Sequence, residues 1–336
     1  MLTRRRFLTV TAAAAGVAAL PAAGRAAPVE WHGTALGARA LLRLHHPDPG
    51  TAWRLVADCL REVERLEAVF SLHRPDSALR RLNRDGALDA PPLDLVVLLN
   101  EAKRYGDLTG GAFDVTVQPL WDLHARHFTA PGADPAGPPE AAVAAARALV
   151  DHRRVAVAPD LVALERPGMA VTLNGIAQGY ITDRVADRLR AAGMAHVLVH
   201  LGETRALGPA EDGRPWRVGI ADPSAPDRPP TRTVDLADGA VATSGGYGTR
   251  FSARCHHLFD PSTGRSAGHV EAATVLAPTA TAADALSTAL AVLPPDEAPR
   301  LLAGAGARAI LQTRDGVRTM NYRHQAHAHG GGFAGA

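Results

Sequence analysis

Apolar residues recur at helical spacing in several stretches of the chain. The strongest lies at 52–70, where apolar positions such as Leu55, Cys59 and Leu66 alternate with Arg and Glu in the pattern of an amphipathic helix. The same reasoning predicts further helices, at 93–105 after a Pro-Pro break, at 140–150, from Ile176 to a C-terminal Gly193, and at 282–293.

Short apolar runs predict the strands, at 196–201, 216–221, 231–236, 240–243, 272–277 and 308–312. Residues 131–139, rich in Pro, Gly and Ala, predict a loop. Helices and strands mix without regular β-α-β alternation. This order favours a single-domain α+β fold over a doubly wound parallel sheet.

The two ends of the chain differ from the rest. Residues 3–8 (TRRRFL) form a twin-arginine pattern, and an apolar run at 9–20 and small residues at 24–26 follow. The apolar run is too short to cross a bilayer of about 30 Å. We expect residues 1–26 to be a twin-arginine signal peptide, with a hydrophobic N-terminal helix as the alternative. The mature protein (27–323) would then be periplasmic and not membrane-spanning. Residues 324–336 are rich in His and Gly, and we expect them to form a disordered tail, with metal binding as the alternative.

Composition and missing motifs exclude several classes of function. With 46% apolar residues the chain can build a substantial core, and with a net charge of +2 and no dense Lys/Arg stripe outside the signal it is a poor nucleic-acid binder. Two cysteines make neither a disulfide scaffold nor a CxxC site, and Cys59 is expected to be a buried thiol. Rossmann, P-loop, zincin and nucleophile-elbow motifs do not occur.

Two segments dense in glycine suggest ligand contact. In 109–116 (TGGAFDVT), glycines permit close backbone approach to a ligand and Phe113 could pack on a ring; the alternative is an ordinary turn. In 172–180 (TLNGIAQGY), small residues open a helix whose N–H groups could bind phosphate, although a packed helix start explains them equally well.

Two later segments carry side chains suited to chemistry. Within 242–261, a Thr-Ser-Gly-Gly turn precedes His257 and Asp260, which are close enough for the carboxylate to orient the imidazole; the alternative is a loop with hydrogen-bonded histidines. On the helix that starts near 281, Asp284 and Thr288 share one face and suit Mg²⁺. Thr281 with Asp284 also fits a helix-capping pattern.

Taken in this order, the segments resemble the ApbE family of FAD:protein FMN transferases. The resemblance runs from Gly33-Thr-Ala-Leu-Gly37 to the Asp284 helix. It includes 70–77 (FSLHRPDS) with Leu82-Asn83, the Gly-Ala-Phe-Asp and Thr-Ser-Gly segments, 257–264 (HLFDPSTG) and 283–289 (ADALSTA).

The resemblance implies a duplicated, T-fold-type core that binds FAD and Mg²⁺. It assigns the metal to Gly175, Asp284, Ser287 and Thr288, and proton transfer to His257 with Asp260. It places FAD on Leu36, His73, Ala112, Phe113, Asp114, Thr172, Gln178, Tyr180, Thr243, Ser244 and Leu258. The implied activity transfers FMN onto a Ser or Thr of a periplasmic or membrane electron-transfer protein. The alternatives are a non-catalytic flavin-binding or maturation protein, an FAD pyrophosphatase, and a periplasmic anion-binding protein.

The chain departs from the family pattern in two places. The family commonly has Asp-x-Gly-x-x-Ala-Lys-Gly-Tyr where this chain has Thr172, Asn174 and Gln178, and often has Gly-Gly-Asp where this chain has Gly202-Glu203. Losing the lysine removes a point charge that would neutralise phosphate. The Asn-Gly-Ile-Ala-Gln-Gly-Tyr version resembles NosX, the branch associated with nitrous oxide respiration.

Overall fold

An eight-stranded antiparallel sheet forms the centre of the protein. The computed structural model describes residues 28–35, 38–225, 228–230 and 232–320, so the expected signal peptide, the tail from 324 and Leu36 lie outside the described residues. Every neighbouring pair of strands in this sheet is antiparallel. The strands in spatial order are β1 (Val29–Ala35), β2 (Ala38–Leu44), β6 (Val197–Leu201), β7 (Thr204–Leu207), β10 (Gly239–Gly245), β13 (Ala272–Ala277), β14 (Arg308–Thr313) and β15 (Gly316–Met320).

The sheet is built from two halves with the same chain order. The first reads β1, β2, α1, α6, β6, β7 and the second β10, β13, α7, α8, β14, β15, when the segments inserted within each half are set aside. Strand pairing between β7 and β10 joins them. The duplicated T-fold-type α+β core expected from the sequence is therefore confirmed. The four helices are α1 (Pro49–Phe70), α6 (Ala177–Ala191), α7 (Ala280–Val292) and α8 (Ala298–Ala305).

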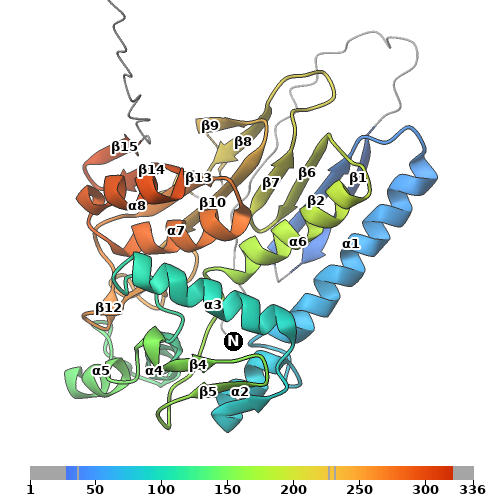
Figure 1. Ribbon diagram of the computed structural model, residues 1–336. Helices are drawn as coiled ribbons and strands as arrows, with labels where there is room; N and C mark the ends of the chain where they lie inside the picture. Colours follow the sequence, from blue (N-terminus) through green and yellow to red (C-terminus); the bar gives the residue numbers. More distant parts are fainter. Residues whose placement is uncertain (1–27, 36–37, 226–227, 231, 321–336) are drawn as a thin grey trace, which may run out of the picture.

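The two faces of the sheet are covered differently. The four helices lie on one face (Figure 1), where Val197 and Val199 of β6 enter the main core. Because side chains alternate along a strand, Leu198 points to the other face. There it packs with Trp216 and Leu236 of a two-stranded ribbon, β8 (Trp216–Ile220) and β9 (Arg232–Leu236).

A long insertion between α1 and α6 lies beyond one end of the sheet (Figure 1). Its β3, β5 and β4 form a small sheet, and a second insertion between β10 and β13 carries the ribbon β11–β12. The inserted elements are α2 (Ala78–Asp85), β3 (Ala87–Asp89), α3 (Leu93–Leu108), α4 (Gln118–Thr129), α5 (Glu140–Arg147), a 3-10 turn η1 (His152–Arg154), β4 (Val155–Val157), β5 (Leu161–Leu164), β11 (Phe259–Asp260) and β12 (Arg265–Ser266); a further 3-10 turn, η2 (Pro295–Glu297), precedes α8.

The elements expected from periodicity are confirmed, including the helix that ends before Gly193 and the loop at 131–139. Gly193 has a φ of +82°, a left-handed conformation that glycine adopts without strain. Cys59 is buried with a free thiol, as expected. Within the part of the chain that the structure describes, no helix has both the length and the apolar character needed to cross a membrane.

Candidate functional site

A cavity opens where the two halves of the sheet meet the insertions. Its wall comes from the segment before α4, the N-terminal turn of α6, the end of β10, the loop after it, and α7. The structure brings most of the expected site residues together there, namely Ala112, Phe113, Asp114, Thr172, Gly175, Gln178, Thr243, Ser244, His257, Leu258, Asp284 and Thr288.

Oxygen donors gather at one end of this cavity. Thr288 Oγ1 lies 3.2 Å from Ser244 Oγ, and a side chain on Gly175 would come within 2.9 Å of the same Thr288 hydroxyl. The absence of a side chain at Gly175 therefore leaves room for the Thr288 hydroxyl, which lies one helix turn from Asp284. Among the described residues, no three His, Cys, Asp or Glu side chains form a metal-binding group. A cation here would need mixed carboxylate, hydroxyl and carbonyl ligands, a set typical of Mg²⁺.

Asp284 is a buried carboxylate with a second one near it. Its side chain is 3% exposed, and burial raises its pKa to about 7. Glu203 lines the same cavity, and burial together with the charge of Asp284 raises its pKa well above the ordinary value. Two carboxylates that water cannot solvate favour a bound cation, because its charge would offset both.

The N-terminal turn of α6 binds a carboxylate of the protein itself. Gly179 N–H donates to Asp284 Oδ2 at 2.9 Å, and the N–H groups of Ile176 and Ala177 donate to the carbonyl of Leu173. Phosphate binding by these N–H groups, one reading of the sequence, is therefore wrong for these three. The Gly179 contact instead fixes Asp284 against the wall of the cavity.

The start of α7 also differs from expectation. Thr279, not Thr281, is the N-cap, and its hydroxyl accepts from Ala282 N–H at 3.2 Å. Thr281 donates its hydroxyl to Asp183 of α6. The capping pattern read from Thr281 and Asp284 is thus wrong, which leaves the Asp284 carboxylate directed to α6 and the cavity.

Ser287 lies behind the cavity wall. It is fully buried, and its hydroxyl is 2.8 Å from that of Ser244. Thr243, on the neighbouring position of β10, shares a hydrogen bond of 2.9 Å with Thr274 of β13. Of the hydroxyls expected from the sequence, Ser244 and Thr288 are therefore the pair closest to one another in the cavity, and Ser287 supports Ser244.

His257 and Asp260 are separated in function. His257 lines the cavity, and its Nδ1 lies 3.2 Å from the carbonyl oxygen of Thr249. Asp260 lines a second cavity, and its carboxylate accepts from Ser262 N–H at 2.8 Å and from the hydroxyls of Ser262 and Thr263. The expectation that Asp260 orients His257 is not supported: the carboxylate closes its own turn, and the Thr249 backbone contacts the imidazole.

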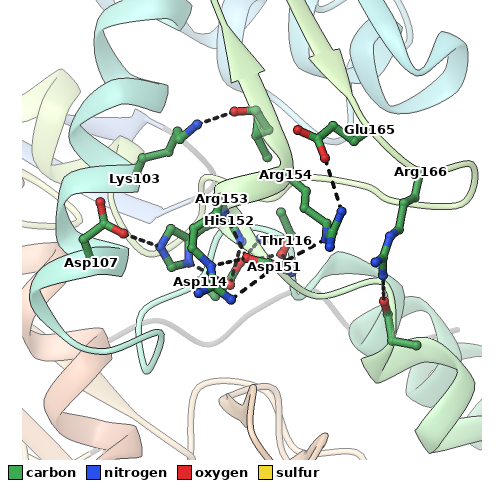
Figure 2. A network of polar contacts seen from close by, with 12 residues as sticks. Lys103, Asp107, Asp114, Thr116, Asp151, His152, Arg153, Arg154, Glu165 and Arg166 are labelled. Atoms are coloured by element: carbon green, nitrogen blue, oxygen red, sulfur yellow. Dashed lines mark hydrogen bonds and ion pairs between the residues drawn. The ribbon is translucent and has the colours of Figure 1, made fainter.

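Asp114 lines the cavity, but its carboxylate is directed away from a ligand. One oxygen accepts from Thr116, and the other accepts from the N–H and Nδ1 of His152 (Figure 2). Asp114 therefore holds the cavity wall from behind, and ligand contact at this segment falls to Ala112, Phe113 and the backbone.

Two expected flavin contacts lie outside the cavity lining. His73 is exposed in the turn after α1, where its N–H donates to Ser71 Oγ. Tyr180 packs its ring against Phe70 and donates its hydroxyl to Asp94 Oδ1 at 2.8 Å. Tyr180 thus joins α6 to α3 and does not line the cavity, which corrects its assignment to FAD from the sequence.

Replacing Tyr180 by Phe tests that correction. We expect the free energy of unfolding to fall by about 1–2 kcal/mol, because the variant loses a hydrogen bond to a carboxylate. FAD affinity should stay unchanged, since the ring and its packing remain. Denaturant unfolding measures the free energy of unfolding, and FAD titration measures the affinity. Weaker FAD binding by the variant would show that Tyr180 contributes to the FAD site.

Other cavity residues were not assigned from the sequence. Arg39, at the start of β2, carries the one permanent positive charge among the described residues that line the cavity. Glu203 was noticed only as a departure from the family pattern. Others include His200, whose burial lowers its pKa to about 4, Trp121 of α4, and Tyr247, whose buried hydroxyl has no hydrogen-bond partner among the described residues. Their sequence signals are weak, because each is a single polar or aromatic residue in a run without a motif.

Comparisons with known proteins agree with this geometry. Residues 35–311 match the ApbE family. The chain is 33% identical over 240 residues to a protein of Vibrio cholerae named FAD:protein FMN transferase, an alignment that covers 69% of this chain and 71% of that protein. The solved flavin transferase ApbE from Vibrio cholerae superposes with a TM-score of 0.74 at 30% identity, over 87% of this chain and 96% of that one. The ApbE protein from Thermotoga maritima gives 0.76 at 28% identity, over 88% and 97%. The chain therefore belongs to the ApbE family.

Proposed function

We propose that this protein is an FAD:protein FMN transferase that requires Mg²⁺. The observation that carries the proposal is the cavity, in which a buried carboxylate, two hydroxyls and a histidine from distant segments meet beside a glycine-rich wall. Membership of the ApbE family and relatives named for this activity support the choice of FAD as substrate.

Asp284, Thr288 and the Gly175 carbonyl would hold the metal. The buried, acceptor-rich set fits a hard cation. Among the described residues, Gly179 N–H is the one donor to the Asp284 carboxylate, at Oδ2, which leaves Oδ1 for the cation. When bound, Mg²⁺ supplies positive charge that stabilises the phosphate oxygens of a pyrophosphate under attack. Glu203 lies at the same end of the cavity. Burial and the charge of Asp284 raise its pKa, and a bound cation would favour its ionised form and so gain a second negative charge.

The transfer exchanges the phosphoanhydride bond of FAD for a phosphoester bond to the acceptor. A Ser or Thr hydroxyl of the acceptor attacks the FMN-side phosphorus, the P–O–P bond breaks, and AMP leaves with the bridging oxygen. His257 accepts the hydroxyl proton. This role requires the tautomer in which Nδ1 donates to the Thr249 carbonyl at 3.2 Å and Nε2 is the basic nitrogen; in the other tautomer Nδ1 accepts from Thr249 N–H at 3.3 Å. The product is FMN joined to the acceptor through a phosphoester.

We further propose that the acceptor is a periplasmic or membrane electron-transfer protein. The twin-arginine pattern at 3–8 supports export to the periplasm, and the NosX-like segment 174–180 supports a role in nitrous oxide respiration. The alternative functions are an FAD pyrophosphatase, for which water would take the place of the acceptor hydroxyl, and a flavin-binding protein without transfer chemistry.

Incubation with FAD, with and without Mg²⁺ and a candidate acceptor domain, tests the proposal. We expect the acceptor to gain the mass of one FMN and flavin fluorescence on a denaturing gel only when Mg²⁺ is present, because chelation removes the charge that stabilises the reacting phosphate. AMP should appear in step with modified acceptor.

The controls separate the alternatives. AMP released at the same rate without acceptor would identify a pyrophosphatase. Tight FAD binding without AMP or modified acceptor, across a panel of acceptor domains, would identify a flavin carrier. Full transfer in excess chelator would contradict the metal requirement alone.

A further inference from the structure

A buried histidine behind the cavity lies between two carboxylates. The imidazole of His152, 6% exposed, has Nδ1 at 3.1 Å from Asp114 Oδ2 and Nε2 at 3.0 Å from Asp107 Oδ1 (Figure 2). Helix α3 makes room for the ring with a glycine, because a side chain on Gly106 would come within 2.5 Å of it. A helix-interior glycine costs about 1 kcal/mol relative to alanine, so the close approach of the ring has a structural cost.

The geometry defines the charge of this imidazole. An ionised carboxylate only accepts hydrogen bonds, so both ring nitrogens must donate, and a ring that donates from both nitrogens is the imidazolium. The hydrogen bonds to Asp114 and Asp107 accordingly raise the pKa of His152, against the opposing effect of burial. His152 is thus a buried cation with two anionic partners.

The Asp114 partner belongs to the wall of the flavin cavity. Its Oδ2 also accepts from the His152 N–H at 2.9 Å, and its Oδ1 accepts from Thr116 N–H at 2.8 Å. Thr116 in turn accepts from Asp151 N–H at 2.8 Å. These bonds tie the segment 112–117, which supplies Ala112, Phe113 and Val115 to the cavity, to the turn η1.

We propose that His152 is a positioning residue for flavin binding: the imidazolium, held between Asp107 and Asp114, fixes the cavity wall 112–117 in the shape that FAD requires. The inference rests on the proposed FAD substrate only for the choice of ligand. The clamp itself can be tested by the titration of the imidazole, which does not depend on transfer activity.

The proposal predicts a pH dependence with a definite sign. The charged groups around the ring are Asp107 on α3, Asp114 in the cavity wall, and Asp151 and Arg153 of η1, which pair with each other. Because the pKa of His152 is raised above 6.5, the clamp is complete at lower pH and is lost as pH rises through the raised value. FAD affinity through this contact should fall over the same range.

Two substitutions separate the two sides of the ring. The amide nitrogen of His152→Asn replaces Nδ1 and can still donate to Asp114, whereas that of His152→Gln replaces Nε2 and reaches toward Asp107. At pH 6 in saturating Mg²⁺ we expect both variants to bind FAD more weakly than wild type, because neither carries the positive charge. The loss should be about threefold in His152→Asn, which keeps a donor for Asp114, and about tenfold in His152→Gln, which loses the charge-assisted hydrogen bond to Asp114. FAD fluorescence quenching measures both.

Asp107→Asn supplies the decisive comparison, because Asp107 is mostly exposed and its loss should not unfold the protein. Removing this charge should lower the midpoint of the His152 titration, followed by NMR of histidine-labelled protein, by about one pH unit. The pH dependence of FAD affinity should shift by the same amount. His127→Asn, at a half-buried histidine on α4 away from this cluster, is the matched control and should shift neither.

An unchanged midpoint in Asp107→Asn would overturn the proposal, as would wild-type FAD affinity in His152→Gln. If His152→Gln does not fold, the Asp107→Asn midpoint and the His152→Asn affinity decide alone. Failure of the proposed function would look different: FMN would not be transferred to an acceptor, or FAD would not bind the wild-type protein at any pH, while the imidazole titration would still shift in Asp107→Asn.

Discussion

Replacing Asp284 by Ala should reduce Mg²⁺-dependent FMN transfer on the order of a thousandfold or more, the scale of effect that loss of several kcal/mol of charge stabilisation produces. The variant removes the carboxylate that accepts from Gly179 N–H and that lines the cavity together with Thr288, on the same face of α7. Flavin fluorescence and intact mass of the acceptor measure the loss. Transfer at the wild-type rate would contradict the assignment of the metal to Asp284.

Asp284→Asn is the matched variant for this experiment. Its amide oxygen can still accept from Gly179 N–H, so the α6–α7 contact is kept while the charge is lost. We expect both variants to lose transfer. Because burial raises the pKa of Asp284 to about 7, ionising it destabilises the metal-free protein as pH rises through that value. Asp284→Asn should therefore melt no lower than the metal-free wild type at pH 8.

The wild-type pKa also makes metal binding depend on pH. Below about pH 7 a proton must leave Asp284 before the cation binds, so Mg²⁺ affinity should rise with pH and then level off above that value. The dependence should vanish in Asp284→Asn together with the high-affinity site. Isothermal titration in two buffers of different ionisation enthalpy would detect the released proton.

Helical periodicity predicted that Asp284 and Thr288 share one helix face, and both line the cavity. Asp284 and Thr288 lie four residues apart on one helix, a relation that follows from the geometry of any helix. Glu203 lies in a tight turn between β6 and β7, and it reaches Asp284 only because the strands of the first half pair with those of the second. Such proximity depends on sheet order, which local sequence does not carry.

The misplaced residues have a related cause. Tyr180 and Gln178 both belong to the first turn of α6, but positions two apart on a helix face different sides. Gln178 faces the cavity and Tyr180 faces α3. The exact start of the helix decides this, and sequence patterns locate helix ends only to within a few residues.

Asp260 was misassigned for a different reason, because closeness in sequence to His257 did not bring the two side chains together.

The folded core was more predictable than its edges. The helices α1 and α7 have long apolar faces, while β1 and β2 contain Trp31, His32, Arg39 and Arg43 among small residues and show no clean alternation. Their pairing with β6 stabilises them as strands, a tertiary effect that overrides weak local preference. Arg39, which this pairing places at the cavity, was missed for the same reason.

His257→Ala should lower the rate of FMN transfer by about 10²- to 10⁴-fold, the usual contribution of a general base, and leave FAD and Mg²⁺ binding intact. His257 lines the cavity on a loop held by the Thr249 backbone, away from the Asp284 donor set, so its loss removes a proton acceptor and no metal ligand. Asp260→Asn is the matched control: its amide oxygen keeps the turn to Ser262, and we expect transfer within a few-fold of wild type. If the two variants lost equal activity, the carboxylate would act with the imidazole after all; if His257→Ala transferred FMN normally, the proton would have to leave by another group of the cavity.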